Sequence, residues 1–463
     1  MTAATAPPAG DAAGGLSYHE AVQAIAERGR FGVRLGLGRT RSLLRALGDP
    51  QAGLRGALVA GTNGKGSVLA LAGAALRAAG YRVGETPKPH LVSYRERLVI
   101  DGRPIDPNAF ARLVGDVVPI ADRLAARHGP ATEFELLTAA IFGWFAAQSI
   151  DVALVEVGLG GRLDATHAWD GGVAVITNVD LDHTDRLGPT VEAIAREKAA
   201  IIERGDLAVT GADSPALPVI ERRAKRVGAP LRVVSPAPLM AWDRDGIELE
   251  LPGLGRTRVG LRGRHQAANV AVADALLDAL AEAGIARVDA EARRMGYATA
   301  RWPGRLELLE VEGREVLLDG AHNPAGAAAL AAALDDLRPF LAGGRDHVPP
   351  PLTLIVASMS DKDVDGVVAA LAASPHVRSA RVVCTAVDDP RALSAADLAA
   401  RWRAAGSVPH DRITVERDPL TALHRALAHG PGPVVVAGSL YLVGLARGRL
   451  IDDPDLRDPE PGT

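Results

Sequence analysis

Cysteine is almost absent from this chain of 463 residues, and no long hydrophobic run occurs in it. The single cysteine, Cys384, excludes an intrachain disulfide and is compatible with a reducing cytosol, so we expect a cytoplasmic protein. A membrane-spanning helix would need about 18 consecutive apolar residues. The longest candidate, residues 434–446, is interrupted by Gly438, Ser439 and Tyr441, so no membrane span is expected.

An excess of basic charge is also lacking. The 52 Lys and Arg residues are balanced by 56 Asp and Glu residues, which leaves a net charge of −4. No global basic field favours nucleic acid or an acidic membrane, so we expect neither as a partner, and any bound anion needs a local site. Residues 1–15 lack the pattern of a signal peptide. Small residues and prolines in 1–15 and in 452–463 predict two flexible tails.

Short β-type runs alternate with helix-type stretches through most of the chain. This alternation predicts an α/β fold with a mainly parallel sheet. Buried strands are expected at residues 57–60, 152–156, 173–179 and 207–210, and helices at 69–79, 135–147, 191–202 and 267–283. Residues 230–259 have shorter runs and turn residues, which predict a small antiparallel insertion.

A second α/β set follows the turn-forming pair Pro303-Gly304. Its strands are expected at residues 316–318, 352–357, 381–384 and 434–437, with helices between them. We therefore place a domain boundary near residue 300, between a first domain of residues 16–300 and a second of residues 301–451. Residues 341–351 are expected to form an exposed insertion.

The sequence GTNGKGS lies between a predicted strand and a predicted helix, which is the context of a phosphate-binding loop. Glycines let backbone N–H groups approach an anion, and the helix N-terminus adds partial positive charge. Lys65 adds a cation, and Ser67 offers a hydroxyl that could ligate Mg²⁺. The spacing departs from GxxxxGK[ST], because Gly66 separates these two residues. A turn without function is the alternative, but it would need neither side chain. The expected phosphate-binding residues are Gly61, Thr62, Asn63, Gly64, Lys65, Gly66 and Ser67.

Polar residues also follow two other predicted strands. Glu156 ends one apolar run, and Asp182 and His183 follow the next. Doubly wound sheets bind ligands at the carboxyl edge of their strands, so these side chains are candidates for a nucleotide and its Mg²⁺. An acid at a strand end or a lone histidine is often only structural. Their place beside a phosphate loop favours the functional interpretation.

Lys198 interrupts the apolar stripe formed by Val191, Ile194 and Ile201 in a predicted helix. One interpretation is a side chain that reaches water past its own methylenes. The other is a buried group paired with an acid or a metal.

Gln266 and Asn269 are two further candidates for binding the nucleotide, because they share a helix face and could hydrogen-bond a base. Amide side chains at the start of a helix could equally be ordinary polar surface. Beyond the domain boundary, polar residues again follow apolar runs. Arg305 could reach a phosphate across a cleft, and Ser439 could hold a small substrate. The second-domain candidates are Arg305, Asp319, His322 and Ser439.

A series of motifs occurs along the chain in this order: VAGTNGKGS, PHL, TEFELLTAAIF, EVGLGGRLDAT, LDHTDRLGPT, IAREKAAII, GRHQAAN, PGRLE, LDGAHNP, DKDV, DDPRAL and GSLYLVG. Together these motifs resemble those of the folylpolyglutamate synthase/dihydrofolate synthase family of the Mur ligase superfamily. The likeness runs from about Phe31 to Arg447. It implies a P-loop ATPase domain with a mainly parallel sheet, a smaller C-terminal Rossmann-like glutamate-ligase domain, and an active site between them.

The resemblance also implies roles and partners. Lys65 and the loop amides would bind ATP phosphates, while Ser67 and Glu156 would ligate one Mg²⁺ and His183 a second. Lys198 matches a lysine that is carbamylated in the family and would then ligate Mg²⁺. The resemblance also implies that ATP is contacted by Gln266, Asn269, Arg305 and Asp319. L-Glutamate would lie near His322 and Ser439, and the acceptor near Pro89 and His90.

The implied reaction activates a folate or dihydropteroate carboxylate with ATP and joins it to L-glutamate, in a protein expected to be a monomer. The chain departs from the family pattern where Lys88 replaces a serine, where residues 94–97 read YRER, and where Leu445 replaces an acid. The first two put the choice of acceptor in doubt. Three alternatives remain: another Mur-type ligase, a P-loop NTPase without ligase activity, and a silent paralogue that only binds nucleotide or folate.

Overall fold

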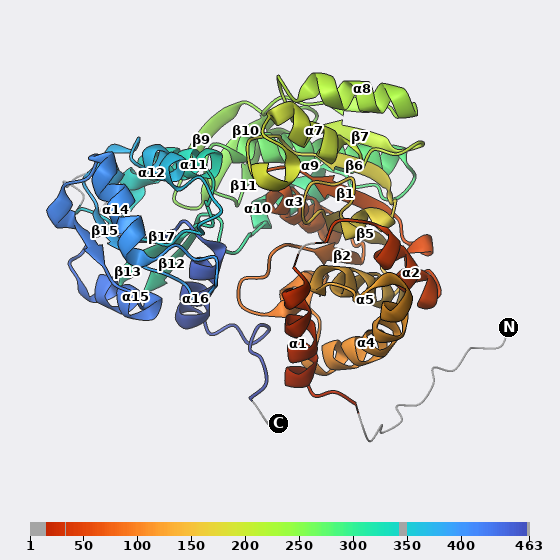
Figure 1. Cartoon of the computed structure of the whole chain (residues 1–463). Helices are drawn as coiled ribbons and strands as arrows, with labels where there is room; N and C mark the ends of the chain where they lie inside the picture. The colour runs from red at the N-terminus through yellow and green to blue at the C-terminus, as the bar shows by residue number, and fades with distance from the viewer. Residues whose placement is uncertain (1–14, 33, 342–349, 461–463) are drawn as a thin grey trace.

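The structure, a computed structural model, describes residues 15–32, 34–341 and 350–460. The chain forms two α/β lobes that lie side by side, the first coloured red to green and the second cyan to blue (Figure 1). The boundary proposed near residue 300 falls between helix α10 (Ala290–Thr299) and strand β12 (Glu307–Val311).

The first lobe is built on an eight-stranded sheet with the order β4-β3-β2-β5-β1-β6-β7-β8. Six neighbouring strands are parallel, and at one edge β3 runs antiparallel to both of its neighbours, β2 and β4. The bounds are β1 Gly56–Ala60, β2 Val83–Thr86, β3 Val99–Ile100, β4 Arg103–Pro104, β5 Val152–Glu156, β6 Gly172–Ile176, β7 Leu207–Thr210 and β8 Leu231–Val233.

Helices cover both faces of this sheet, because its central strand is apolar on both sides. Ala57 and Val59 of β1 join the core on one face, and Leu58 and Ala60 join the core on the other, as the two-residue period of a strand requires. The first face packs against α3 (Lys65–Ala78), α9 (Gln266–Glu282) and α10. The second packs against α1 (Tyr18–Ala26), α2 (Gly38–Ala46), α4 (Pro107–His128), α5 (Glu133–Ala147), α7 (Val191–Ala199) and α8 (Leu217–Val227).

The predicted antiparallel insertion is confirmed in β9 (Leu239–Asp243), β10 (Gly246–Leu251) and β11 (Gly255–Val259). Its predicted start at residue 230 is wrong, because β8 instead pairs in parallel with β7 and extends the main sheet. One predicted strand and one predicted helix also extend further along the chain than the structure shows. The strand expected to reach residue 179 ends at Ile176, where Thr177 turns its hydroxyl to the carbonyl of Asn63. The helix expected to reach residue 202 ends at Ala199.

The second lobe has a six-stranded sheet with the order β12-β13-β17-β14-β15-β16, in which only β12 is antiparallel to its neighbour. Its helices again lie on both faces, and Cys384 is buried at the end of β15. The bounds are β13 Arg314–Leu318, β14 Thr353–Val356, β15 Arg381–Cys384, β16 Ile413–Val415, β17 Val434–Ala437, α11 Pro324–Leu337, α12 Val364–Leu371, α14 Ala395–Ala405, α15 Pro419–Ala428 and α16 Leu440–Leu450.

The segment after α16 returns to the first lobe. Asp458 accepts hydrogen bonds from the hydroxyls of Tyr18, at 2.8 Å, and Ser93, at 2.9 Å. The tail expected at 452–463 therefore has specific contacts in its described part. Of the other expected tail only Gly15 is described, and residues 342–349 of the expected insertion lie outside the described residues. Among the helices that are described, none is long and apolar enough to span a membrane.

The close approach of α10 to α3 gives a first prediction. A Cβ atom added at Gly296 would lie 2.4 Å from the backbone of Ala75, so Gly296→Ala must push the two helices apart. We expect it to lower the free energy of unfolding by about 1–3 kcal/mol. Gly143→Ala in α5 is the matched control, because a Cβ there meets nothing within 4 Å. Calorimetric unfolding of both variants measures the difference, and equal midpoints would contradict the packing described.

Candidate active site

A cleft of about 1320 Å³ lies between the two lobes. Its first wall comes from the carboxyl ends of β1, β5 and β6, which are neighbours in the first sheet. Its second wall comes from the carboxyl ends of β13, β14 and β17, which are neighbours in the second sheet. The cleft is therefore formed by the ligand-binding edges of two α/β sheets that face each other.

The phosphate loop connects β1 to α3 and is held by the end of β6. The Asn63 N–H donates to Asn178 Oδ1 at 2.8 Å, and the Thr177 hydroxyl donates to the Asn63 carbonyl at 2.6 Å. Gly64 has a φ of 80°, and a Cβ there would lie 2.2 Å from Asn269 Oδ1 of α9. Glycine is thus required both by the backbone conformation and by the neighbouring helix.

Two lysine ammonium groups converge on one carbonyl of this loop. Lys65 Nζ lies 3.1 Å from the Gly61 oxygen, and Lys198 Nζ lies 2.9 Å from the same oxygen. Lys198 is buried, so the interpretation in which its side chain reaches water is wrong. Burial, helped by the charge of Lys65, lowers the pKa of Lys198 to about 7. The result is a concentration of positive charge at a loop built to approach anions.

Glu156 lies beside these cations at the end of β5. Its Oε1 is 3.8 Å from Lys65 Nζ, and its Oε2 accepts the backbone N–H of Lys88 at 2.9 Å. Burial raises the pKa of the Glu156 carboxyl. The Lys88 ammonium donates to the main-chain oxygen of Glu156 and lies 4.9 Å from the ring centroid of Phe134. Burial lowers the pKa of Lys88 to about 8, so this side chain remains mostly charged at neutral pH.

The second lobe supplies the opposite wall. Asp319 accepts the N–H groups of Leu306 and Ala321, each at 2.9 Å, which fixes its carboxylate at the end of β13. His322 Nδ1 lies 2.8 Å from the Gly320 carbonyl, so Nδ1 carries the proton and Nε2 is an acceptor. Burial, with the charge of Lys362, lowers the pKa of His322 to about 4. The Ser439 hydroxyl is buried and has no hydrogen-bond partner among the described residues.

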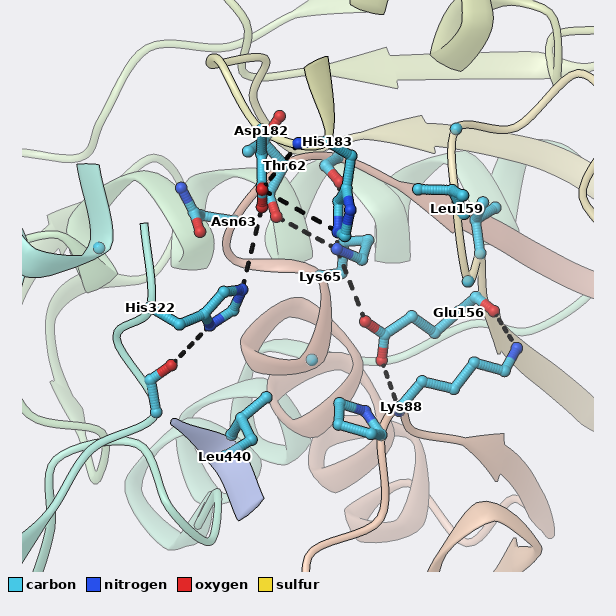
Figure 2. A pocket seen from close by; sticks show the side chains of 18 of the residues that line it. Thr62, Asn63, Lys65, Lys88, Glu156, Leu159, Asp182, His183, His322 and Leu440 are labelled. Atoms are coloured by element: carbon cyan, nitrogen blue, oxygen red, sulfur yellow. Dashed lines mark hydrogen bonds and ion pairs between the residues drawn. The ribbon is translucent and has the colours of Figure 1, made fainter. Parts of the chain in front are cut away.

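An ion pair joins the two walls. Lys362 Nζ donates to Asp182 Oδ1 at 2.7 Å and lies 3.3 Å from His183 Nε2 (Figure 2 labels Asp182 and His183). Asn323 Nδ2 donates to Asp182 Oδ2 at 3.1 Å. Burial disfavours the Asp182 carboxylate, but the Lys362 ammonium outweighs this and holds its pKa below the usual range. Neither Lys362 nor Asn323 was singled out from the sequence, although both stand in the recognised motifs DKDV and LDGAHNP.

Most of the predicted site residues line the cleft, and two do not. Gln266 is buried behind it, where it accepts from Asn269 Nδ2 at 2.8 Å and donates to Ser67 Oγ at 3.4 Å. His90 accepts from Arg97 Nε at 2.9 Å, outside the cleft. The predicted residues in the lining are Gly61, Thr62, Asn63, Gly64, Lys65, Gly66, Ser67, Pro89, Glu156, His183, Lys198, Asn269, Arg305, Asp319, His322 and Ser439.

The structure places the positions that depart from the family pattern in different surroundings. Arg95 donates to the carbonyls of Ile105 and Arg457, so it ties the chain together rather than facing the cleft. Leu445 is exposed on α16. Of Lys88, Arg95 and Leu445, only Lys88 lines the cleft, together with Arg97 from the segment 94–97.

The fold is that of a Mur ligase. Residues 59–277 match the Mur ligase middle domain, and residues 304–440 match the Mur ligase glutamate ligase domain. The chain is 34% identical over 444 residues to a dihydrofolate synthase/folylpolyglutamate synthase of Bacillus subtilis, covering 94% of this chain and 99% of the relative. It is 37% identical to the protein of that name from Mycobacterium tuberculosis, covering 90% of each chain.

The chain belongs to the folylpolyglutamate synthase/dihydrofolate synthase family, and the predicted family, fold class and class of enzyme, an ATP-dependent acid–amino-acid ligase, are confirmed. Solved structures agree. The M. tuberculosis folylpolyglutamate synthase complexed with ADP and AMPPCP superposes with a TM-score of 0.81 at 33% identity, over 94% of this chain and all of that one. Escherichia coli FolC in complex with DHPP and ADP superposes with a TM-score of 0.77 at 28% identity, over 93% of this chain and 97% of that one. The bifunctional folylpolyglutamate synthase/dihydrofolate synthase of Yersinia pestis complexed with AMPPNP and Mn superposes with a TM-score of 0.77 at 30% identity, over 94% of this chain and 98% of that one.

The tight fit of the phosphate loop against α9 gives a second prediction. Gly64→Ala must displace either the loop or Asn269, so we expect its affinity for ADP to fall at least about tenfold. Gly80→Ala is the matched control, because Gly80 also has a positive φ, 85°, but a Cβ there meets nothing within 4 Å. Titration calorimetry with ADP compares the two, and a Gly64→Ala protein that binds as wild type would contradict the role of this contact.

Proposed function

We propose that this enzyme adds L-glutamate to the carboxylate of a folate or dihydropteroate, with ATP as the phosphoryl donor. The observation that carries the proposal is the meeting of two sheet edges across one cleft, with the phosphate loop on one wall and His322 and Ser439 on the other. The complexes of related enzymes with ADP, AMPPCP and DHPP support both the nucleotide and the acceptor.

The first step forms an acyl phosphate. An acceptor carboxylate oxygen attacks the γ-phosphorus of ATP, and ADP leaves with the electrons of the broken P–O bond. Two anions must approach each other, and two unit charges about 4 Å apart repel by roughly 4 kcal/mol at an effective dielectric of about 20. Lys65 on the first wall and Arg305 on the second offset this repulsion, because both side chains line the cleft.

The second step forms the amide. The α-amine of glutamate attacks the acyl carbon, and inorganic phosphate leaves. The attacking nitrogen must carry a free electron pair, so its ammonium form has to lose a proton first. His322 is placed for this step, because its Nδ1 lies against the Gly320 carbonyl and its Nε2 is left as an acceptor on the cleft wall. The unpaired hydroxyl of Ser439 is available to the amino acid.

We propose two Mg²⁺ sites, held by Ser67 and Glu156 and by His183 and Lys198. Among the described residues, no three His, Cys, Asp or Glu side chains converge as a metal site of their own. This donor set fits Mg²⁺ carried in by the nucleotide, because Mg²⁺ is usually held by one or two carboxylates, phosphate oxygens and water. Mn in the related AMPPNP complex supports a divalent ion here. When bound, the ions would withdraw charge from the transferring phosphoryl group.

Lys198 can join such a site only after its charge is reversed. An ammonium repels a cation, whereas a carbamate formed from the neutral amine and CO₂ carries a negative charge. The reaction needs the unprotonated amine, and burial with a pKa of about 7 supplies it at neutral pH. We therefore propose that Lys198 is carbamylated in the working enzyme. A monomeric state and a cytoplasmic location stay predictions.

Glutamate transfer itself gives the third prediction. Wild-type protein with ATP, Mg²⁺ and radiolabelled glutamate should label dihydropteroate, tetrahydrofolate or both. Lys65→Ala and His183→Ala should each lower the rate by roughly a thousandfold or more, because each removes a charge or ligand at the transferring group. Lys225→Ala and His424→Ala, at exposed positions, are the controls. Wild-type turnover in a folded Lys65→Ala or His183→Ala protein would remove that residue from the mechanism.

Chemical rescue gives the fourth prediction. Lys198→Ala should lose most of its activity and leave a cavity beside Gly61. Acetate or propionate should restore part of that activity, because a small carboxylate can occupy the place of the carbamate. The rescue is measured as labelled product against carboxylate concentration, with Lys65→Ala as the variant that should not respond. Absence of rescue up to high concentration would count against the carbamate.

A further inference from the structure

A segment that follows α16, residues 452–458, crosses from the second lobe back to the first and is called here the C-terminal strap (Figure 1 shows it running from α16 toward α1). We propose that Asp458 of this strap is a positioning residue for the acceptor. By holding the loop of residues 88–97 in place, it fixes the side chains that this loop contributes to the cleft. The inference rests on the proposed function and adds to it a residue that lies outside the cleft.

The first argument is the socket that receives Asp458. One oxygen of this carboxylate, Oδ1, accepts from the Tyr18 hydroxyl at 2.8 Å, from the Ser93 hydroxyl at 2.9 Å and from Arg95 Nε at 3.3 Å. The three donors are no more than 5% exposed. Arg95 also donates to the main-chain carbonyl of Arg457 at 3.1 Å. Three buried donors on one oxygen, one of them charged, form a specific site for a carboxylate.

The second argument is that the strap has little slack. The N–H groups of Leu456 and Arg457 both donate to the Asp453 carbonyl at 3.0 Å, so the strap is folded into a turn. Asp453 Oδ2 lies 3.8 Å from Nη2 of Arg447, a buried residue of α16 whose Nε is 3.1 Å from Glu307 Oε1. The strap is therefore fastened to the second lobe at one end and to the first lobe at the other.

The third argument is the loop that the socket belongs to. Lys88 and Pro89 line the cleft at its start, and Arg97 lines the cleft at its end. Between them the Glu96 carboxylate accepts the N–H groups of residues 91–93, at 2.6–3.2 Å. Arg95 and Arg97 stand in the same short helix, η3 (Tyr94–Arg97). Because the loop is bonded to itself in this way, a shift at Arg95 is carried to the residues that face the cleft.

The fourth argument separates this loop from the nucleotide site. A Cβ atom added at Gly444 of α16 would lie 2.0 Å from the Leu91 carbonyl oxygen, so the 88–97 loop also lies directly on the second lobe. The phosphate loop, in contrast, is held by Thr177 and Asn178 of its own lobe. Loss of the Asp458 contact should therefore disturb the acceptor and leave the nucleotide in place.

The test compares the KM values of the three substrates, from initial rates of radiolabelled glutamate incorporation. Asp458→Ala should raise the KM for the acceptor, dihydropteroate or tetrahydrofolate, by roughly 5- to 20-fold, because the cleft side of the loop loses its fixed position. The KM for ATP, the KM for glutamate and kcat should stay within about twofold of wild type. Asp458→Asn keeps an oxygen acceptor without the charge, so its KM for the acceptor should lie between wild type and Asp458→Ala.

Asp455→Ala is the matched control, because Asp455 is an exposed carboxylate of the same strap that makes none of the contacts with Tyr18, Ser93 or Arg95. It should leave all three KM values unchanged. Thermal unfolding shows whether each variant is folded at the assay temperature. If Asp458→Ala is not, Asp458→Asn and Tyr18→Phe decide by the same comparison.

An unchanged KM for the acceptor in folded Asp458 variants would overturn the inference. An equal rise in the KM for ATP or glutamate would also overturn it, because that pattern marks a general loss of packing between the lobes. If wild-type protein forms no amide with either acceptor, the proposed function fails, which is a different result.

Discussion

Two ammonium groups that share one carbonyl oxygen are the constraint on which the first lobe depends. Lys65 and Lys198 both lie about 3 Å from the Gly61 oxygen, so their charges are no more than about 6 Å apart. At an effective dielectric of about 20 their repulsion is of order 3 kcal/mol. At the same dielectric, the attraction between Lys65 and the ionised carboxylate of Glu156, 3.8 Å apart, is about 4 kcal/mol, so Glu156 can offset this repulsion. A bound polyphosphate, or conversion of Lys198 to a carbamate, would add further negative charge at the same place.

The second lobe completes this arrangement because it brings charge of both signs to the same cleft. Asp182 of the first lobe and Lys362 of the second attract each other across it, while Asp319 and His322 are fixed by backbone groups of their own lobe. Contacts within a lobe set the geometry of each wall. The contacts between the lobes include the Asp182–Lys362 ion pair in the cleft, the Arg264–Asp336 ion pair and the packing of Leu91 against the core of the second lobe.

Much of the fold and of the first wall could be predicted from the sequence, because the signals there are local. The phosphate loop, Glu156 and His183 each follow an apolar run, and parallel strands bring such positions to one edge. The strand ending at Ile176 was predicted too long, since Val179 is apolar and nothing local shows that Thr177 turns to bind Asn63. Lys362 could not be placed beside Asp182, which is 180 residues away in the chain. Gln266 and His90 have the right chemistry, but near neighbours in the chain, Asn269 and Arg97, engage their side chains, and the sequence pattern does not show these contacts.

Lys88 changes the charge of the first wall at a position where the family pattern has a serine. Its backbone N–H and its ammonium both bind Glu156, the first the carboxylate and the second the main-chain oxygen. A residue with a hydroxyl at this place could make the first contact but would bring no charge. The lysine instead sets a cation against the Phe134 ring, between the phosphate loop and the part of the cleft lined by Leu159 and Asp164. The lysine therefore adds a cation beside Glu156, whose charge favours the ionised form of that carboxyl, and it changes the charge of the cleft lining at this place.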